Sequence, residues 1–555
     1  MKTAVDKSKS QVLFEKLLLW SDLSCLFTGW LRIEAVLASW ARGSFIFRFL
    51  LQDRNDWIEG SWVYQGFWAL ISWFWQLGCG AASVALRILR KVFPQAVIYD
   101  SWVGLVITGL FTNPGSILVI TVFLMPLIPT KATLGMLLLF IISVVVSVTT
   151  SVSASVSNSV SNSVTTLDKL NMVDQKSKGS GWFKRVDAFR QSWGTPFDLP
   201  VILFLSILAV AAVLSIERTQ SMITGLLYLL FVLFFYLVSW VLSRENHASS
   251  LKAVVWALML ASVILSLFGL YQYVVGVPVE KSWVDEKMFT GLESRVFATL
   301  DNPNVLAEFF VFTIPLSLAV LWSSRNNITR LFIAGIIGLS VLCLVLTFSR
   351  GAWLGFALAM LIFFLLKDRR ALFLLLIMGV VGMFFLPESI LARVASIGNL
   401  QESSTAYRLS IWAASLRIIA DYWVSGIGPG LPTFAIVYPY YSLAAGMAYH
   451  SHNLFLQLVV EMGIVGLGAF LWLMWTFVRV GLKGLRATED PYLKNLLIGL
   501  LSGMAGFLLQ GLTDYVWYSP RLILTFWLML GLMAAAVRQG DSPSPNLPEV
   551  CRKAG

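Results

Sequence analysis

The chain has 555 residues, of which 57% are hydrophobic and 13% are charged, and its mean hydropathy is +0.77. Soluble domains carry about 25% charged residues, so this composition excludes an ordinary soluble protein. The formal net charge of +11 is typical of basic loops on the inner side of a membrane and does not indicate nucleic-acid binding. We predict an all-α, polytopic membrane protein.

The N-terminal region carries the weakest membrane signals. Residues 1–60 interleave arginines with Trp, Leu and Phe, which is typical of an amphipathic segment at the membrane interface. Residues 61–151 contain the first apolar stretches, at 62–85, 101–128 and 133–151. Asn113-Pro114-Gly115 interrupts the second stretch, which is either one span or two short pieces. Residues 152–199, first Ser-rich and then basic, are predicted to form a flexible cytoplasmic linker.

The predicted transmembrane core covers residues 200–387, and its apolar stretches are near the length of about 20 residues that crosses a bilayer. These stretches are 200–216, 219–243, 253–276, 303–322, 330–348, 351–367 and 371–387. An outward loop at 277–302 interrupts them, and a long outward loop with amphipathic helices follows at 388–451. The C-terminal region 452–538 adds spans at 452–478, 493–513 and 521–537, before a cytoplasmic tail at 539–555. We expect about 11–13 transmembrane helices.

Short basic connections set the predicted orientation. They lie at 325–330, 367–370 and 479–486, and the positive-inside rule places them in the cytoplasm. Alternation of the spans then puts the loops 277–302 and 388–451 and the connection 514–519 on the opposite face. The start of the span at His452 shares that face.

The long loop predicts a surface helix and then a break. Residues 405–420 are predicted to form an amphipathic helix on the membrane surface. The residues at helical spacing are Tyr407, Arg408, Ile411, Trp412 and Leu416. Gly426-Ile-Gly-Pro-Gly430 ends this helix, and four tyrosines lead from there to His450.

Two of the three histidines of the chain, His450 and His452, stand at the start of one apolar helix. His452 has three interpretations: a capping or interfacial residue, half of a metal site with His450, or a general base. A metal site needs three or four ligands, and the neighbouring sequence shows no Cys or carboxylate cluster. We therefore favour a histidine base and predict no metal and no other cofactor.

Three further polar residues have both a structural and a functional interpretation. Arg295 is either an interfacial arginine or a planar guanidinium that presents itself to phosphate or carboxylate. Arg350, at a tight outward turn, either points into a cavity on the same face as His452 or neutralises carbonyls at a helix C-terminus. Glu461 lies about 13 Å along the helix from His452, so we expect a structural partner role for this intramembrane carboxylate.

The pattern His452-Asn453, nine residues, Gly463, two residues and Gly466 resembles the signature of the O-antigen ligase/Wzy polymerase superfamily. Supporting elements are Arg295 before Asn302-Pro-Asn304, Ser349-Arg350-Gly-Ala, and Arg408 before the glycines at 426–430. The resemblance covers roughly residues 200–537. Within the superfamily the chain looks closest to cyanobacterial proteins of the IctB type, which are named as bicarbonate transporters. The motifs behind this finer resemblance are Arg42-Gly-Ser44 and Asp301 to Ala307.

The resemblance implies a membrane glycosyltransferase that ligates or polymerises glycans. Its donor would be a polyprenyl-pyrophosphate-linked glycan, its acceptor a glycan or lipid, and its active face the periplasmic face of the plasma membrane. Arg295 and Arg408 would bind the pyrophosphate, and His452 would deprotonate the acceptor hydroxyl. Apart from the resemblance, Arg350, Glu461 and His450 are candidate accessory residues because of their positions in the sequence.

The alternative function is bicarbonate transport or assistance to bicarbonate uptake, because a positive outward vestibule attracts that anion too. Two features of the sequence weigh against transport. The ionisable residues gather at one membrane surface rather than at the midplane, and the sequence shows no inverted internal repeat. The residues therefore favour the enzyme.

Overall fold

The computed structural model describes residues 113–163, 192–243, 248–277, 295–371, 388–396, 403–443 and 447–541, with five residues between 66 and 73. Within this part of the chain all regular secondary structure is helical, and nine helices are long and apolar enough to cross a membrane. The all-α, polytopic membrane fold is therefore confirmed. The predicted segment 1–60 and most of the predicted spans 62–85 and 371–387 lie outside the described residues, as do most of the loop 277–302 and of the linker 152–199.

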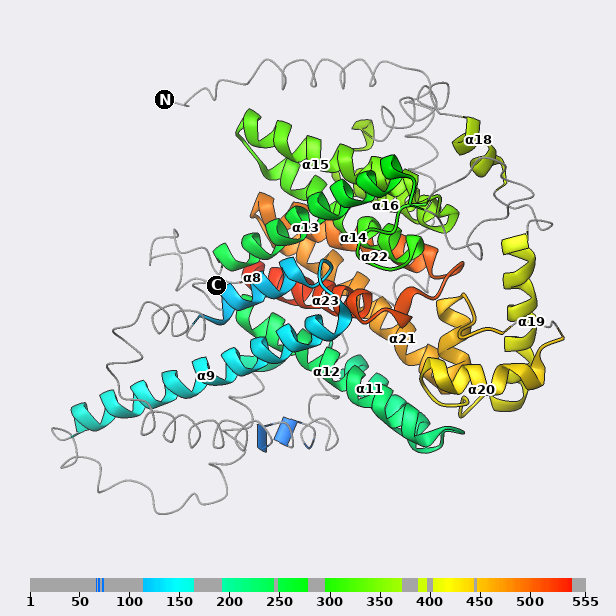
Figure 1. Ribbon diagram of the computed structural model, residues 1–555. Helices are drawn as coiled ribbons and strands as arrows, with labels where there is room; N and C mark the ends of the chain where they lie inside the picture. The colour runs from blue at the N-terminus through cyan, green and yellow to red at the C-terminus, as the bar shows by residue number, and fades with distance from the viewer. Residues whose placement is uncertain are drawn as a thin grey trace, which may run out of the picture.

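The centre of the molecule contains α14 (Pro303–Ser323), α22 (Pro491–Gln510) and α23 (Pro520–Asp541) (Figure 1). On the outside, α15 (Asn327–Leu346) packs against α14, and α16 (Arg350–Lys367) packs against α22. Of the described spans, α14 and α23 are the most enclosed by protein, with 89% and 94% of their spanning windows buried. Gly355 of α16 faces Gly506 of α22, and a Cβ at Gly355 would lie 2.6 Å from the Gly506 carbonyl oxygen. The missing side chains let these two backbones approach closely, which is a common way to pack membrane helices.

Five further helices pack around this centre. They are α8 (Pro114–Leu124), α9 (Thr130–Ser163), α11 (Asp198–Val213), α12 (Arg218–Leu242) and α13 (Ala248–Val275). The Asn-Pro-Gly interruption is a helix start, because α8 begins at Pro114 and the Asn113 side chain accepts the Ser116 N–H at 3.4 Å.

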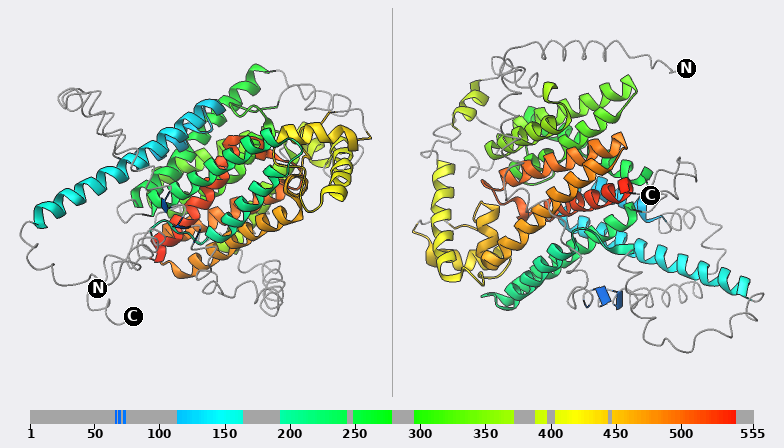
Figure 2. Two further views of the ribbon diagram at one scale, coloured as in Figure 1. Left: turned by 90° about the horizontal axis from the view of Figure 1, so that it is seen from below. Right: turned by 180° about the vertical axis from the view of Figure 1, so that it is seen from behind.

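Helix α9 is longer than the span predicted at 133–151. It continues to Ser163, so the first part of the predicted linker is helical. Its 34 residues reach about 51 Å at the rise of an α-helix, and no Gly or Pro occurs between Met136 and Ser163 to end it. Figures 1 and 2 show α9 projecting beyond the other helices, away from α19 and α20.

The described residues of the long segment 388–451 contain three helices at one end of the bundle (Figures 1 and 2). They are α18 (Glu388–Ala395), α19 (Ser403–Tyr422) and α20 (Leu431–Tyr441). The predicted helix at 405–420 is thus present. Its buried face carries Ile411, Ala414 and Ile418, which pack in a small core with α20, whereas Leu416 is 56% exposed. Helix α19 packs this buried face against α20 and α21, and its predicted position on the membrane surface stays a prediction.

Helix α21 (Leu454–Ala487) is interrupted at Gly463, which has φ 69° and ψ −177°. This conformation is open almost only to glycine. The segment 423–430 crosses the break, and we call this contact with residues 460–464 the glycine crossing. Three backbone hydrogen bonds form it: Ile427 N–H to the Val460 carbonyl (2.8 Å), Gly428 N–H to the Glu461 carbonyl (3.1 Å) and Ile464 N–H to the Trp423 carbonyl (2.8 Å). The carbonyls released by the interrupted helix are therefore paired.

Candidate active site

His452 lies in the short segment 450–453 that precedes α21. Asn453 caps this helix, since its side-chain oxygen accepts two backbone N–H groups of the first turn. Two hydrogen bonds fasten the segment to the chain after α22: Asn453 Nδ2 to the Leu512 carbonyl (2.9 Å) and Leu454 N–H to the Gly511 carbonyl (2.7 Å). These bonds bring His452 beside Asp514, which is 62 residues further along the chain.

His452 Nδ1 lies 3.0 Å from Asp514 Oδ1. Burial disfavours the charge of Asp514, but the hydrogen bond from His452 and the charges of His452 and Arg408 hold the pKa of this carboxyl well below its usual range. Because the carboxylate is the acceptor, Nδ1 of the neutral imidazole carries the proton and Nε2 keeps a lone pair. The geometry therefore leaves one ring nitrogen of His452 able to accept a proton.

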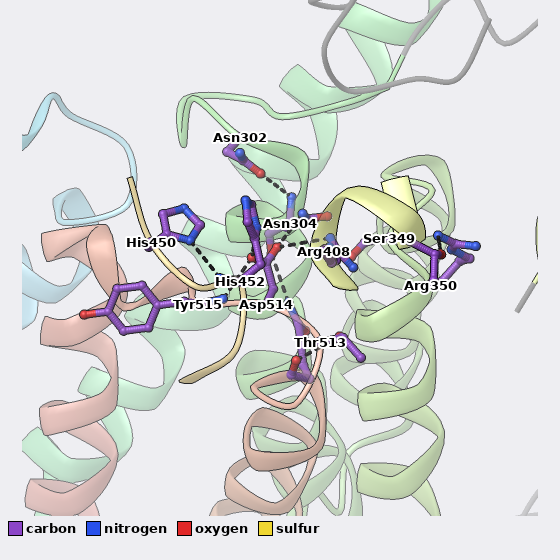
Figure 3. A network of polar contacts seen from close by, with 12 residues as sticks. Asn302, Asn304, Ser349, Arg350, Arg408, His450, His452, Thr513, Asp514 and Tyr515 are labelled. Atoms are coloured by element: carbon purple, nitrogen blue, oxygen red, sulfur yellow. Dashed lines mark hydrogen bonds and ion pairs between the residues drawn. The ribbon is translucent and has the colours of Figure 1, made fainter. Parts of the chain in front are cut away.

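The other carboxylate oxygen of Asp514 faces cations and amides. Asn304 Nδ2 donates to it at 2.5 Å, and a terminal guanidinium nitrogen of Arg408 lies 3.8 Å away. Asn304 Oδ1 in turn accepts from Arg295 Nη2 at 3.3 Å. Figure 3 shows Asp514 between His452 and Arg408. This one carboxylate thus connects the predicted base with both predicted arginines.

A small cavity, partly open to solvent, lies beside Asp514. Four arginines line it, namely Arg295, Arg350, Arg393 and Arg408, and Asp514 is the one carboxylate among its described lining residues. Burial above all, and then the charges of Arg393, Arg408 and Arg350, lower the pKa of Arg295 to about 9. Arg295 remains protonated near neutral pH, and an anion in the cavity would relieve the repulsion among the guanidinium groups.

Arg350 is the first residue of α16 and lines this cavity. Its Nη1 donates to the carbonyl and the hydroxyl of Ser396 at 2.9 and 3.2 Å, and its Nη2 donates to the Thr405 hydroxyl at 3.3 Å. Arg393 Nε donates to the Phe348 carbonyl at 3.4 Å. Both interpretations of Arg350 have support, because Arg350 lines the cavity and also donates to the Ser396 carbonyl directly after the C-terminus of α18.

Arg295 and Glu461 are both buried, in different surroundings. Arg295 is 7% exposed, and its Nε donates to the Thr347 carbonyl at 2.8 Å, so it is a wall of the cavity rather than an interfacial arginine. Glu461 Oε1 accepts from Gln457 Nε2 at 2.9 Å, and Gln457 Oε1 accepts the Ser451 N–H at 2.7 Å. Glu461 is thus connected to the histidine segment through one glutamine.

His450, His452 and Asp514 each offer an atom that a metal could bind, and these atoms all lie within 4.8 Å of one another. The sequence next to the histidines shows no carboxylate cluster, and Asp514 reaches them from a distant part of the chain. His452 Nδ1 and Asp514 Oδ1 already bond each other, however, and the nearby arginines repel a dication. The donor set suits a base and its orienting carboxylate better than a metal ion.

The sequence did not single out three residues of this site. Asp514 is the only acidic residue between Asp490 and Asp541, and a solitary carboxylate beside a membrane span is a usable signal. Asn304 follows the helix cap Asn302 and could have been found by its place in Asn302-Pro-Asn304. Arg393 lies in the last turn of α18, in a stretch of the sequence with no spacing pattern that distinguishes it.

Residues 333–471 match the family model described as O-Antigen ligase. The matched segment includes Arg350, Arg408 and His452, whereas Arg295 and Asp514 lie outside it. A comparison with curated proteins gave no match. The family match supports an O-antigen ligase-like function in general terms, in which a lipid-linked glycan donor and an acceptor meet at a multi-pass membrane protein.

Proposed function

We propose that the chain transfers a glycan from a polyprenyl-pyrophosphate donor to an acceptor hydroxyl, without a metal ion. One observation carries this proposal. His452 and Arg408 meet on the two oxygens of the same buried carboxylate, Asp514, at 3.0 and 3.8 Å. A base and a cation are therefore close enough to act on the attacking and the leaving oxygen of one substitution.

His452 is the base in this reaction. Asp514 holds its Nδ1–H, so Nε2 accepts the proton of the acceptor hydroxyl as that oxygen attacks the anomeric carbon of the donor. The new C–O bond forms while the bond from the anomeric carbon to the pyrophosphate oxygen breaks, and the electron pair leaves with the pyrophosphate. Attack from the opposite side inverts the anomeric carbon.

Arg295 and Arg408 bind the pyrophosphate in this proposal. Both line the cavity, and guanidinium groups make paired, charge-assisted hydrogen bonds to phosphate oxygens. They stabilise the negative charge that grows on the leaving group. Arg350 and Arg393 add positive charge to the same wall and fasten α18 and α19 to the turn before α16.

The proposed site faces the periplasm from the plasma membrane. It lies where α14, α16, α21 and α23 begin and where α15 and α22 end. The basic connections at 325–330, 367–370 and 479–486 lie at the opposite ends of these helices. The positive-inside rule assigns those connections to the cytoplasm.

The direct test uses purified protein with a polyprenyl-pyrophosphate-linked glycan and measures release of the lipid pyrophosphate together with extension of the acceptor. His452→Ala should abolish transfer while the protein still accumulates in the membrane. His247→Ala is the matched control, because Arg244 and Lys252 flank this third histidine, so the positive-inside rule assigns it to the cytoplasm, and it lies outside the described residues. Transfer at the wild-type rate by His452→Ala would refute the proposed base.

Bicarbonate transport is the competing function. The cavity lined by the four arginines, which we call the arginine cavity, would also attract a small anion. The two functions separate in liposomes. The proposed enzyme should not accumulate labelled bicarbonate, whereas a transporter would show saturable uptake that Arg408→Ala reduces. Such uptake would refute the glycan transfer proposal.

A further inference from the structure

The backbone of His452 is held in a conformation that histidine rarely adopts. Its φ is +49°, in the left-handed region, which few residues other than Gly, Asn and Asp occupy. Such a conformation persists only where the surroundings fix it. The groups that fix the segment 450–453 therefore decide where the ring of His452 points.

His450 makes the contact that reaches the His452 backbone. Its Nδ1 accepts the backbone N–H of His452 at 3.2 Å, so the neutral ring of His450 carries its proton on Nε2. The Tyr518 ring stacks on His450 with centroids 5.2 Å apart and planes 12° from parallel. The Tyr515 ring packs on it with centroids 5.6 Å apart. His450 is thus held by the residues that directly follow Asp514.

The other N–H groups beside His452 have different partners. Ser451 N–H donates to Gln457 Oε1 at 2.7 Å, and Leu454 N–H donates to the Gly511 carbonyl at 2.7 Å. Each partner therefore restrains a different residue of the segment. Loss of the acceptor on His450 would release the restraint on the His452 N–H, while the bond from the Ser451 hydroxyl to the Asn453 carbonyl at 2.8 Å would remain.

We propose that His450 is a positioning residue whose neutral imidazole holds the left-handed backbone of His452, so that the His452 ring meets Asp514 and presents Nε2 to the acceptor. The presentation of Nε2 to an acceptor rests on the proposed function. The restraint on His452 is a property of the fold and can be measured without it.

Two substitutions separate the hydrogen-bond acceptor from the aromatic ring. His450→Asn keeps an acceptor atom close to the position of Nδ1 and loses the stacking on Tyr518, whereas His450→Phe keeps a ring and loses the acceptor. His450→Phe should lower kcat by about tenfold with an unchanged KM for the donor, and His450→Asn should keep kcat within about threefold of wild type. Wild-type kcat in His450→Phe, or an equal loss in both variants, would overturn the proposal.

A spectroscopic measurement tests the restraint independently of activity. The chain has three histidines, so the nitrogen spectrum of histidine-labelled protein is simple to assign. Wild type should show His452 protonated at Nδ1 and His450 protonated at Nε2. His450→Phe should convert His452 to a mixture of tautomers, and His450→Asn should not.

The outcomes of the two experiments are distinguishable. An unaltered His452 spectrum in His450→Phe would overturn the positioning role even if wild type transfers glycan. The predicted spectra in a wild-type protein without transfer activity would support the positioning role and refute the proposed function. Loss of turnover on treatment with a chelator would instead indicate a metal bound by His450, His452 and Asp514, and would overturn the proposal.

Discussion

The glycine crossing and the arginine cavity are both polar interruptions of the helical bundle, but they use their polar groups differently. At the crossing, backbone groups of the segment 423–430 pair with those of the broken helix, and Ser215 and Ser221 hydroxyls donate to the carbonyls of Ile427 and Pro429 at 3.1 and 2.8 Å. At the cavity, Arg408 makes no hydrogen bond within the described residues, and its ion-pair partner Asp514 is 3.8 Å away.

This difference separates framework from site. Buried polar groups that all bond one another stabilise one arrangement of the chain, and they have little capacity left for a ligand. A guanidinium with unused donors beside three other cations has that capacity, and it gains most from an anion. Substitutions at the crossing should therefore act on folding, and substitutions at the cavity should act on turnover or on donor binding.

The largest expected effect lies at the crossing. Gly463→Ala places a Cβ 2.0 Å from the Val424 carbonyl oxygen in a conformation that alanine avoids, so we expect destabilisation by more than about 3 kcal/mol and almost no folded protein. The yield in the membrane and the Tm in detergent measure this. Gly468→Ala, in the same helix with no atom within 4 Å of the new Cβ, should fold normally. Normal folding of Gly463→Ala would mean that the crossing is not a rigid framework.

The next effect is a loss of turnover without a loss of fold. In the wild type, both carboxylate oxygens of Asp514 accept or face donors. Asp514→Asn replaces one oxygen with an NH₂ group, which must then face either His452 Nδ1 or the donors Asn304 and Arg408. Either orientation disturbs the tautomer or the position of His452, and we expect kcat to fall by about 10²- to 10⁴-fold. Single-turnover transfer assays measure the change.

The control for Asp514→Asn is Asp421→Asn. Asp421 accepts from the Tyr441 hydroxyl at the surface of α19 and does not line the cavity. The Asp421→Asn variant should retain the wild-type kcat. Equal rates for wild type and Asp514→Asn would remove Asp514 from the mechanism and weaken the distinction between the cavity and the crossing.

A smaller effect distinguishes the two proposed pyrophosphate ligands. Loss of a charge-assisted contact in Arg408→Ala should raise the KM for the donor by about 10- to 100-fold and leave the Tm unchanged. Arg295→Ala should raise the KM similarly and also lower the Tm, because the buried Arg295 holds the Thr347 carbonyl and Asn304. Arg417→Ala, on the exposed side of α19, is the control for both. Unchanged donor binding in both cavity variants would contradict the proposed pyrophosphate site.

The sequence predicted the helices of this molecule better than the contacts between them. Apolar stretches of spanning length predicted most described helices, because membrane burial imposes a composition that is visible residue by residue. The same argument predicted that α9 ends near residue 151, which is too early. The Ser-rich stretch that follows is no longer apolar, but it contains no residue that ends a helix. Composition therefore predicts where a chain can cross a membrane and not where a helix stops.

The site shows the same limit. His452 was noticed because the chain has only three histidines, and the arginines were noticed because they lie on the same predicted face. Asp514 was not assigned a role, because its contact with His452 depends on hydrogen bonds from Asn453 and Leu454 to the chain after α22. Those bonds follow from helix packing and leave no spacing pattern in the sequence. Likewise, Gly463 belonged to a motif whose physical reason, a broken helix crossed by a loop, required the structure.

The smallest expected effect is a pH dependence of stability at the histidine segment beside the cavity. Burial first, and then the charge of His452, lower the pKa of His450 from 6.5 to about 3 in the folded protein. Asp514 opposes this shift and Arg408 adds to it. Between these two pKa values the unfolded chain binds more protons at His450 than the folded protein does, so stability falls as the pH decreases from about 6.5.

The Tm of wild type and of His450→Asn between pH 6.5 and pH 4.5 measures this contribution. The wild-type protein should lose at most about 1.4 kcal/mol per pH unit more than the variant, because one proton is involved. Asp514 does not interfere in this window: its pKa is lowered in the folded state, so its own contribution is lost only below its ordinary value of 3.8. Parallel Tm curves for the two proteins would mean that His450 is not kept neutral by the fold, and the hydrogen bond that it accepts from His452 would then lack its physical basis.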